Sequence, residues 1–176
     1  MSVDPAVALF LRLLLAGIFA LAAFSKLRQR EVFEGIVADY RILPAALVAP
    51  FARVLPFVEL AAAALVLVPA TVAAGAVLAA LLLAAFAAAM AVNILRGRTD
   101  IDCGCFLGAL PRRIGWPLVV RNLLLVLGSL ALLLPVAPRA LVWLDAVSVA
   151  GALVVVGASY AAASRMFELA WPGERG

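Results

Sequence analysis

Long runs of apolar residues, separated by short polar segments, make up most of the chain. Five runs of at least 18 residues occur, at 5–25, 51–68, 72–95, 116–134 and 141–164. An α-helix rises 1.5 Å per residue and the hydrocarbon core of a bilayer is ~30 Å thick, so runs of this length are typical of spanning helices. The runs are continuous and do not alternate with polar residues, which excludes a transmembrane β-barrel. The pattern therefore predicts an all-α polytopic membrane bundle of about five spans, four core spans and one more.

A mixed segment follows the first apolar run. Its apolar residues recur at helical spacing, and they are Val32, Phe33, Ile36, Val37 and Tyr40, whereas Glu31, Glu34 and Asp39 take the other face. This pattern predicts a short amphipathic helix at the membrane surface. Pro44 and Pro50 then precede the second span, and the three-residue turn at 69–71 makes the second and third spans antiparallel neighbours. Neither an internal repeat nor a domain linker is visible, so residues 1–176 are interpreted as a single integral membrane domain.

Composition excludes several other classes of protein. Of the 176 residues, 68% are hydrophobic and 14% are charged, whereas soluble domains are about 45–50% apolar and about 25% charged. A soluble enzyme or a disordered chain is therefore excluded. The net charge of +4 comes with arginines beside apolar runs, which indicates contact with the lipid bilayer and no nucleic acid. The chain has no histidine, so it lacks the commonest general base and the commonest transition-metal ligand.

Charge also predicts the orientation. With five spans, eleven basic residues fall on one side, namely Lys26, Arg28, Arg30, Arg41, Arg53, Arg96, Arg98, Arg112, Arg113, Arg165 and Arg175. Arg139 alone falls on the other, while Arg12 and Arg121 lie inside spans. The positive-inside rule then places the C-terminus and the loop between the third and fourth spans in the cytoplasm, and the N-terminus outside a bacterial inner membrane. Asp4 and Arg12 are atypical of a signal peptide, so the first run is interpreted as a retained helix.

The two cysteines of the chain, Cys103 and Cys105, lie in that loop with Gly104 between them. Cysteines this close reach disulfide distance only through a tight turn, which glycine permits. Closing a one-residue loop adds almost no stability, and strained disulfides are the reducible kind, so we interpret the pair as catalytic rather than structural. Four arginines near the pair, Arg98 among them, favour the thiolate, whereas Asp100 and Asp102 oppose it.

Two other interpretations of the cysteines stay open. A pair of thiolates at Cys103 and Cys105 suits a soft ion such as Cu(I), although a closed zinc site needs four ligands. The second is that both cysteines are ordinary small residues of a loop and that the protein is a membrane scaffold subunit in which they are dispensable.

Polar residues inside the spans are the remaining candidates. Glu59 is costly in lipid unless it has a partner, and Arg12 is one candidate for an ion pair with it. Asn93, Arg121 and Asn122 lie near the cysteine-loop ends of the third and fourth spans. They either join helices through hydrogen bonds or line a pocket beside the thiols. We favour the first role for the two asparagines and the second for Arg121.

The order of these landmarks resembles the MauE family, within the wider MauE/DoxX group of redox-associated membrane proteins. The shared positions are Arg12, Gly17, Ser25-Lys26-Leu27, the segment 40–44, Pro56, Glu59, Asn93, Arg96-Gly97-Arg98, Asp102-Cys103-Gly104-Cys105-Phe106, Gly108 and Arg121-Asn122. Leu107 departs from the pattern, because a glycine is expected directly after the phenylalanine.

The resemblance implies a role in maturation. Proteins similar to MauE are associated with a thioredoxin-like partner and with an exported, disulfide-rich client, the small subunit of methylamine dehydrogenase. A single cysteine pair leaves three mechanisms open: access from both sides of the membrane, exchange with a quinone held near Arg121, or work on one face with a partner protein. No cofactor is required by the residues. The implied partner is periplasmic, whereas the charge count places the cysteines in the cytoplasm, and alternating access would reconcile the two.

Overall fold

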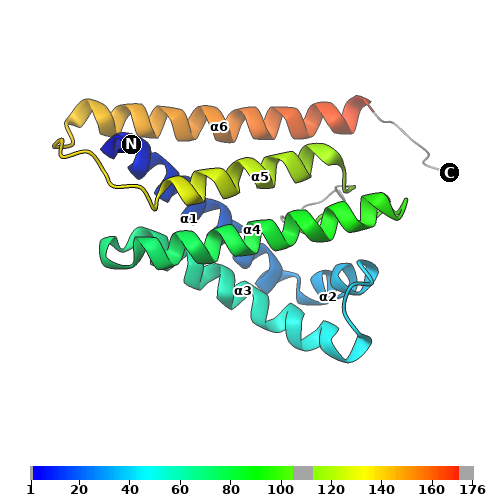
Figure 1. Ribbon diagram of the computed structural model, residues 1–176. Coiled ribbons are helices and arrows are strands. Elements are labelled where there is room, and N and C mark those ends of the chain that lie inside the picture. The colour runs from blue at the N-terminus through cyan, green and yellow to red at the C-terminus, as the bar shows by residue number, and fades with distance from the viewer. Residues whose placement is uncertain (1, 105–112, 171–176) are drawn as a thin grey trace.

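A computed structural model describes residues 2–104 and 113–170 as a bundle of helices (Figure 1). The elements in chain order are α1 (Pro5–Arg28), α2 (Arg30–Asp39), α3 (Ala45–Leu67), the 3-10 turn η1 (Pro69–Thr71), α4 (Val72–Leu95), α5 (Trp116–Ala131) and α6 (Trp143–Ala170). Within the described ranges, β pairing is limited to two isolated bridges. The predicted all-α class is therefore confirmed.

Three helices are long and apolar enough to cross a membrane: α1, α3, and α4 together with η1. Helix α5 is apolar but, with 16 residues, shorter than a full span, and residues Trp143–Ser159 of the 28-residue α6 are apolar as well. The third predicted span, 72–95, agrees with α4 in both bounds. The fourth was predicted to run from 116 to 134, but α5 ends at Ala131. The count of five spans stays a prediction.

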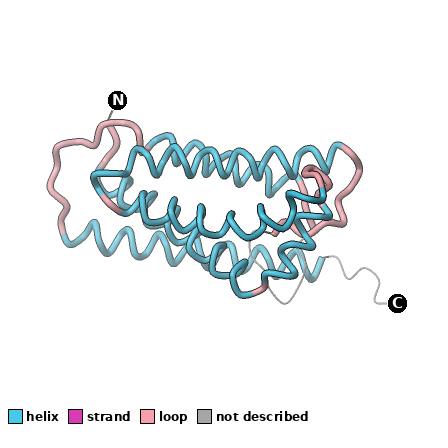
Figure 2. The backbone as a smooth tube through the Cα atoms, turned by 90° about the horizontal axis from the view of Figure 1, so that it is seen from below, coloured by secondary structure: helices cyan, strands magenta, loops and turns pink. Residues whose placement is uncertain are grey.

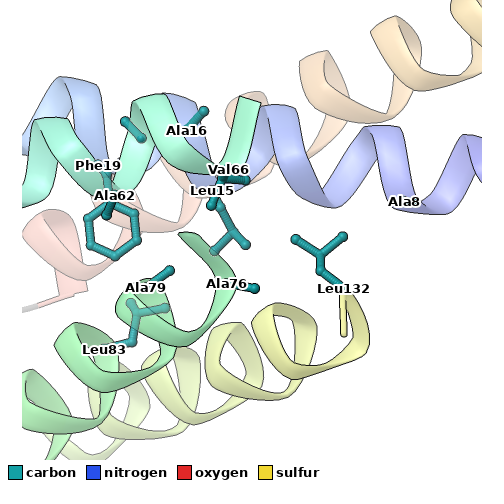
Figure 3. Packing of buried hydrophobic residues seen from close by; sticks show 11 residues of the cluster. Ala8, Leu15, Ala16, Phe19, Ala62, Val66, Ala76, Ala79, Leu83 and Leu132 are labelled. Atoms are coloured by element: carbon teal, nitrogen blue, oxygen red, sulfur yellow. The ribbon is translucent and has the colours of Figure 1, made fainter. Parts of the chain in front are cut away.

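The helices pack as chain neighbours along most of the bundle. α1 packs on α3, α3 on α4 and α4 on α5, while α6 lies along α1 (Figures 1 and 2). The main core lies where these helices cross, and its fully buried members include Leu15 and Phe19 of α1. These side chains face Ala62, Val66 and Ala79 across the core (Figure 3). Small alanine side chains let the helix backbones approach closely, which favours association of helices in lipid.

Helix α3 begins earlier than the sequence pattern predicts. The second span was predicted to start at residue 51, with Pro44 and Pro50 outside it. Instead α3 begins at Ala45 with Pro44 as its N-cap, so that Pro50 lies inside the helix; Pro56 lies inside it as predicted. Proline removes one backbone donor, but neighbouring groups re-satisfy the backbone in membrane helices, so the helix continues through it.

The amphipathic helix predicted after the first span is α2. Its buried residues are Phe33 and Ile36, and it packs on α3. Val32 is 53% exposed, although it was predicted to share the apolar face. The helix therefore docks on the bundle through a narrower face than the sequence indicates.

At the opposite end of the bundle, an exposed ion cluster joins the start of α1 to the link between α5 and α6 and to the first turn of α6. Arg139 donates to Asp4, the N-cap of α1, at 2.9 Å and to Asp145 at 2.9 Å. The hydrogen bond from Arg139, together with one from the Ala6 N–H, lowers the pKa of Asp4 below its ordinary value of 3.8. Backbone bonds from Val3 to Pro135 and from Ala137 to Val3 close the same junction. Among the described residues, the other exposed arginines gather at the cysteine-loop end.

This junction is expected to loosen in acid. A carboxylate with a lowered folded pKa stabilises the fold above its unfolded pKa, and that contribution is lost as the pH falls through the folded pKa. Amide exchange at Val3 and Ala137, corrected for intrinsic rates, should therefore speed up below pH 3.8 relative to pH 6. Asp4→Asn should show less of this pH dependence, while Asp145, whose pKa the hydrogen bond from Arg139 also lowers, still titrates. Equal pH dependence in the Asp4→Asn variant would contradict the assignment.

Candidate functional site

The cysteine loop starts from a tightly capped helix end. Gly97 has φ +72° and ends α4, while its N–H donates to Ile94 and the N–H of Arg98 donates to the Asn93 carbonyl. This is the Schellman arrangement, which needs a left-handed residue after the helix. The Arg98 guanidinium then donates to the Asn93 side chain at 3.1 Å and to the Asp39 carbonyl at 2.8 Å. Asn93 and Arg98 thus tie the end of α4 to the end of α2.

Short backbone contacts close the base of the loop. The Ile114 N–H donates to the Ile101 carbonyl at 2.9 Å, and Asp102 pairs with Arg113 in an isolated bridge. Residues 105–112 lie outside the described residues, so the predicted positions of Cys105 and Phe106 are not placed. Cys103, in the described part of the loop, is buried in the bundle.

Cys103 lies inside the protein, with 8% of its surface exposed. The Tyr40 hydroxyl, at the end of α2, donates to the Cys103 carbonyl at 3.4 Å. Cys103 also belongs to a small apolar cluster with Met90, Ile101 and Ile114. Its backbone is therefore fixed against α2 and α4, which is how a rigid scaffold would hold a reactive group.

Gly104 has the left-handed backbone conformation that glycine permits. Its φ is +66°, and its N–H donates to the Asp102 carboxylate at 2.8 Å. A Cβ placed on Gly104 would lie 3.1 Å from Cγ2 of Ile36 and 3.4 Å from Cε2 of Phe33. Glycine is required here both for the left-handed backbone and for the close approach of α2.

Gly104→Ala is therefore expected to disturb the loop without unfolding the bundle. A left-handed non-glycine residue costs about 1–2 kcal/mol, and the contact with Ile36 adds to it. We expect the Cys103 thiol to react faster with a maleimide, because the loop moves away from α2. Gly35→Ala is the matched control, since a Cβ there meets nothing within 4 Å. Unchanged maleimide reactivity in Gly104→Ala would contradict this account of the turn.

A cavity of about 320 Å³ adjoins the loop. Its walls come from α2, α3 and α4, and the loop contributes Cys103 and Gly104. Aromatic rings of Phe33, Tyr40, Phe51 and Phe86 line much of it. Ligand pockets are commonly mostly apolar hollows of at least ~300 Å³ with a few polar groups. The size and the lining meet that description.

Lys26 lines this cavity and also forms a buried ion pair. Its Nζ is 2.6 Å from Oε1 of Glu59, with the two residues 2% and 0% exposed. Phe33 and Phe86 place their rings 5.2 Å and 5.6 Å from Nζ. A carboxylate and two aromatic faces thus stabilise the charge of Lys26 inside the bundle.

This pairing corrects the prediction for Arg12. Arg12 does not pair with Glu59: it donates to the carbonyls of Val66, at 2.9 Å, and of Leu67, near the end of α3. The last carbonyls of a helix have no intrahelical partner, so an arginine in the neighbouring helix can cap them. Lys26, which was counted as a loop residue, is instead part of α1 and buried.

Arg121 and Asn122 line a second, much smaller cavity of about 20 Å³. Lys26, Glu59 and Phe86 line it as well, whereas Cys103 lines the larger cavity. Arg121 donates to the Asn122 side chain at 3.1 Å. The predicted cluster of Asn93, Arg121 and Asn122 is thus divided: Asn93 holds the loop, and the other two face the ion pair.

Sequence reasoning missed Lys26 and the Tyr40 hydroxyl as members of the site. Leu15, Phe19, Ala22 and Ala23 are buried on one face of α1, and Lys26 continues that face one turn later. The helical period therefore contained the signal for burial of Lys26. Nothing in the sequence pattern indicates the contact between Tyr40 and Cys103, since it joins residues 63 positions apart.

Comparison with known proteins identifies the family of the chain. The family profile described as "Methylamine utilisation protein MauE" matches residues 4–135. The chain belongs to the MauE family. A MauE protein of Paracoccus denitrificans is 50% identical over 131 residues, which are 74% of this chain and 70% of that protein. One of Methylorubrum extorquens is 43% identical over 139 residues, 78% of this chain and 75% of that protein. No solved structure matches the chain significantly.

The MauE match includes the whole of the site. It spans α1 to α5, the cysteine loop and all residues that line the two cavities, while α6 lies beyond it. The three long apolar helices and the family together indicate a membrane protein.

Proposed function

We propose that this MauE-family chain is a thiol–disulfide redox protein of the bacterial inner membrane, acting in methylamine utilisation. Cys103 and Cys105 would pass electrons to or from a thioredoxin-like partner and so assist disulfide maturation of an exported client, as the family resemblance implies. The observation that carries the proposal is the setting of Cys103. It precedes a left-handed Gly104, its backbone is held by Tyr40, and it lines a cavity.

Exchange through the pair needs one cysteine to attack and the other to resolve. A thiolate attacks a disulfide of the partner and forms a mixed disulfide, and the second thiolate then displaces the partner's thiol. The net step breaks one disulfide in the partner and forms one in this chain. Gly104 supports this role, because its left-handed backbone is the conformation that permits the tight turn needed by a disulfide between cysteines two positions apart.

The orientation is part of the proposal. The exposed arginines Arg28, Arg53, Arg96 and Arg113 lie at the cysteine-loop end, which favours the cytoplasm for that end. Burial of Lys26 against Glu59 removes one residue from the earlier count of eleven but leaves the imbalance in place. Electrons would then enter from the cytoplasm and leave outward by alternating access.

Trapping the mixed disulfide tests the exchange reaction. Purified Cys103→Ser and Cys105→Ser variants are incubated with an oxidised thioredoxin whose resolving cysteine is alkylated after attack, and the products are separated without reductant. One of the two variants should accumulate a covalent adduct, and the double variant should form none. Absence of an adduct from both variants would contradict the proposal. Stoichiometric Cu(I) retention that both substitutions remove would then favour the thiolate metal carrier.

A further inference from the structure

We propose that the 320 Å³ cavity binds the ring of a lipid-soluble quinone, which exchanges two electrons with the cysteine pair. The electron-transfer part of this proposal rests on the proposed redox function, whereas binding of the ring does not. The location differs from the quinone site considered near Arg121, because Arg121 lines the smaller cavity.

The cavity has a closed inner end and an apolar outer rim. Phe33, Leu55 and Cys103 in its walls are 4%, 6% and 8% exposed, whereas Ile42 and Phe51 are 45% and 41% exposed. Ile42 lies in the link between α2 and α3, and Phe51 lies near the start of α3. Both α3 and α4 are spanning helices by length and composition. An apolar rim on the flank of such helices suits a ligand that arrives from the hydrocarbon region of the bilayer.

One charged donor reaches the inner end of the cavity. Among the described residues, the Lys26 ammonium donates to Oε1 of Glu59 alone, and an ammonium has three N–H donors. A ligand carbonyl oxygen in the cavity would accept a hydrogen bond from a second N–H of the Lys26 ammonium. Such a charge-assisted bond also strengthens as negative charge develops on that oxygen during reduction. An acyl chain would gain nothing from the ammonium.

The aromatic lining of the cavity also favours a flat ring as the ligand. Four aromatic side chains, Phe33, Tyr40, Phe51 and Phe86, surround the space, and aromatic rings pack well by offset stacking or edge to face. A quinone ring combines a flat apolar body with carbonyl oxygens at its edge. The rings, the ammonium and the volume thus favour the same class of ligand.

The redox step balances for a quinone and one dithiol. Oxidation of the Cys103 and Cys105 thiols breaks two S–H bonds, forms one S–S bond and releases two electrons and two protons. A quinone takes up the same two electrons and two protons, and its two carbonyls become two hydroxyls. Cys103 lies in the wall of the cavity, so the donor and the acceptor share one space. The reverse reaction, from hydroquinone to disulfide, balances equally.

Binding of decylubiquinone to the detergent-purified protein tests the site. Ala85→Phe fills the cavity from α4, while Ala84→Phe is the matched control, since Ala84 is exposed and lines neither cavity. We expect Ala85→Phe to weaken binding by about tenfold or more and Ala84→Phe to leave it unchanged. Lys26→Met should weaken binding by about tenfold, because it removes a charged hydrogen bond. Equal binding in Ala85→Phe and Ala84→Phe would overturn the location.

Two further measurements separate this proposal from the proposed function. The Cys103→Ser/Cys105→Ser protein should still bind decylubiquinone, and the reduced wild type should form a disulfide when decylubiquinone is added. Exchange with thioredoxin but no quinone binding would overturn the quinone site and leave the proposed function intact. Binding without thiol oxidation would overturn the electron transfer. Displacement by oleate that is equally strong in Lys26→Met would make the cavity a lipid site and overturn the proposal.

Discussion

Cys103→Ser is expected to reduce thiol–disulfide exchange to the level measured without protein. Serine keeps the size of the side chain but cannot form a disulfide, and exchange proceeds through a thiolate at every step. The loss should be complete rather than partial, since the pair acts as a unit and either cysteine alone cannot complete a cycle. The measurement is the rate of disulfide transfer to or from thioredoxin by protein in proteoliposomes.

The control for this substitution is Thr99→Ala. Thr99 is an exposed residue of the same loop, four positions before Cys103. Thr99→Ala should retain the wild-type rate, and the two variants should melt within a few degrees of each other. Full activity in Cys103→Ser would contradict the redox account and favour a scaffold role in which the cysteines are dispensable.

Lys26→Met is expected to be among the most destabilising single substitutions in the bundle. It removes one partner of an ion pair in which Glu59 is completely buried, and so leaves a buried charge without its partner. Breaking a buried pair in this way costs about 3–5 kcal/mol. For a chain of this size, that corresponds to a fall of about 6–20 °C in melting temperature. The measurement is thermal unfolding in one detergent or nanodisc preparation.

A double-mutant cycle isolates the ion pair from other effects. Glu59→Gln alone should also destabilise strongly, whereas Lys26→Met/Glu59→Gln should recover at least half of the summed loss, because neither charge then remains. Arg139→Gln serves as the control for loss of a positive charge. Its ion pair with Asp4 is exposed, and exposed ion pairs contribute little to the free energy of unfolding. Strictly additive losses in the double variant would show that Lys26 and Glu59 are not coupled.

Most helices could be predicted from the sequence, because the signals for them lie within each segment. Continuous apolar length predicted α1 and α4, and the 3.6-residue period predicted α2. The start of α3 was misplaced because proline weakens a helix in water more than inside a bundle. The count of spans depends on where α5 and α6 lie relative to a bilayer, which neither composition nor helix length determines.

The candidate site was only partly predictable, because its contacts join distant segments. The turn at Gly104 follows from local backbone geometry and was expected. The choice of Lys26 over Arg12 as the partner of Glu59 depends on how α1 rotates against α3, since both cations lie on the same helix. That Arg121 lines the smaller cavity and Cys103 the larger one likewise depends on helix packing.

The redox cycle of Cys103 and Cys105 is the central claim, and differential alkylation tests it most directly. The thiols are labelled in intact cells and in inverted vesicles, with and without prior reduction, and the two modified forms are quantified by mass. The account predicts that the pair is partly oxidised and that reduction makes both cysteines reactive, with labelling from either side of the membrane. Thiols that stay fully reduced and are labelled only from the cytoplasm would contradict a transmembrane redox relay.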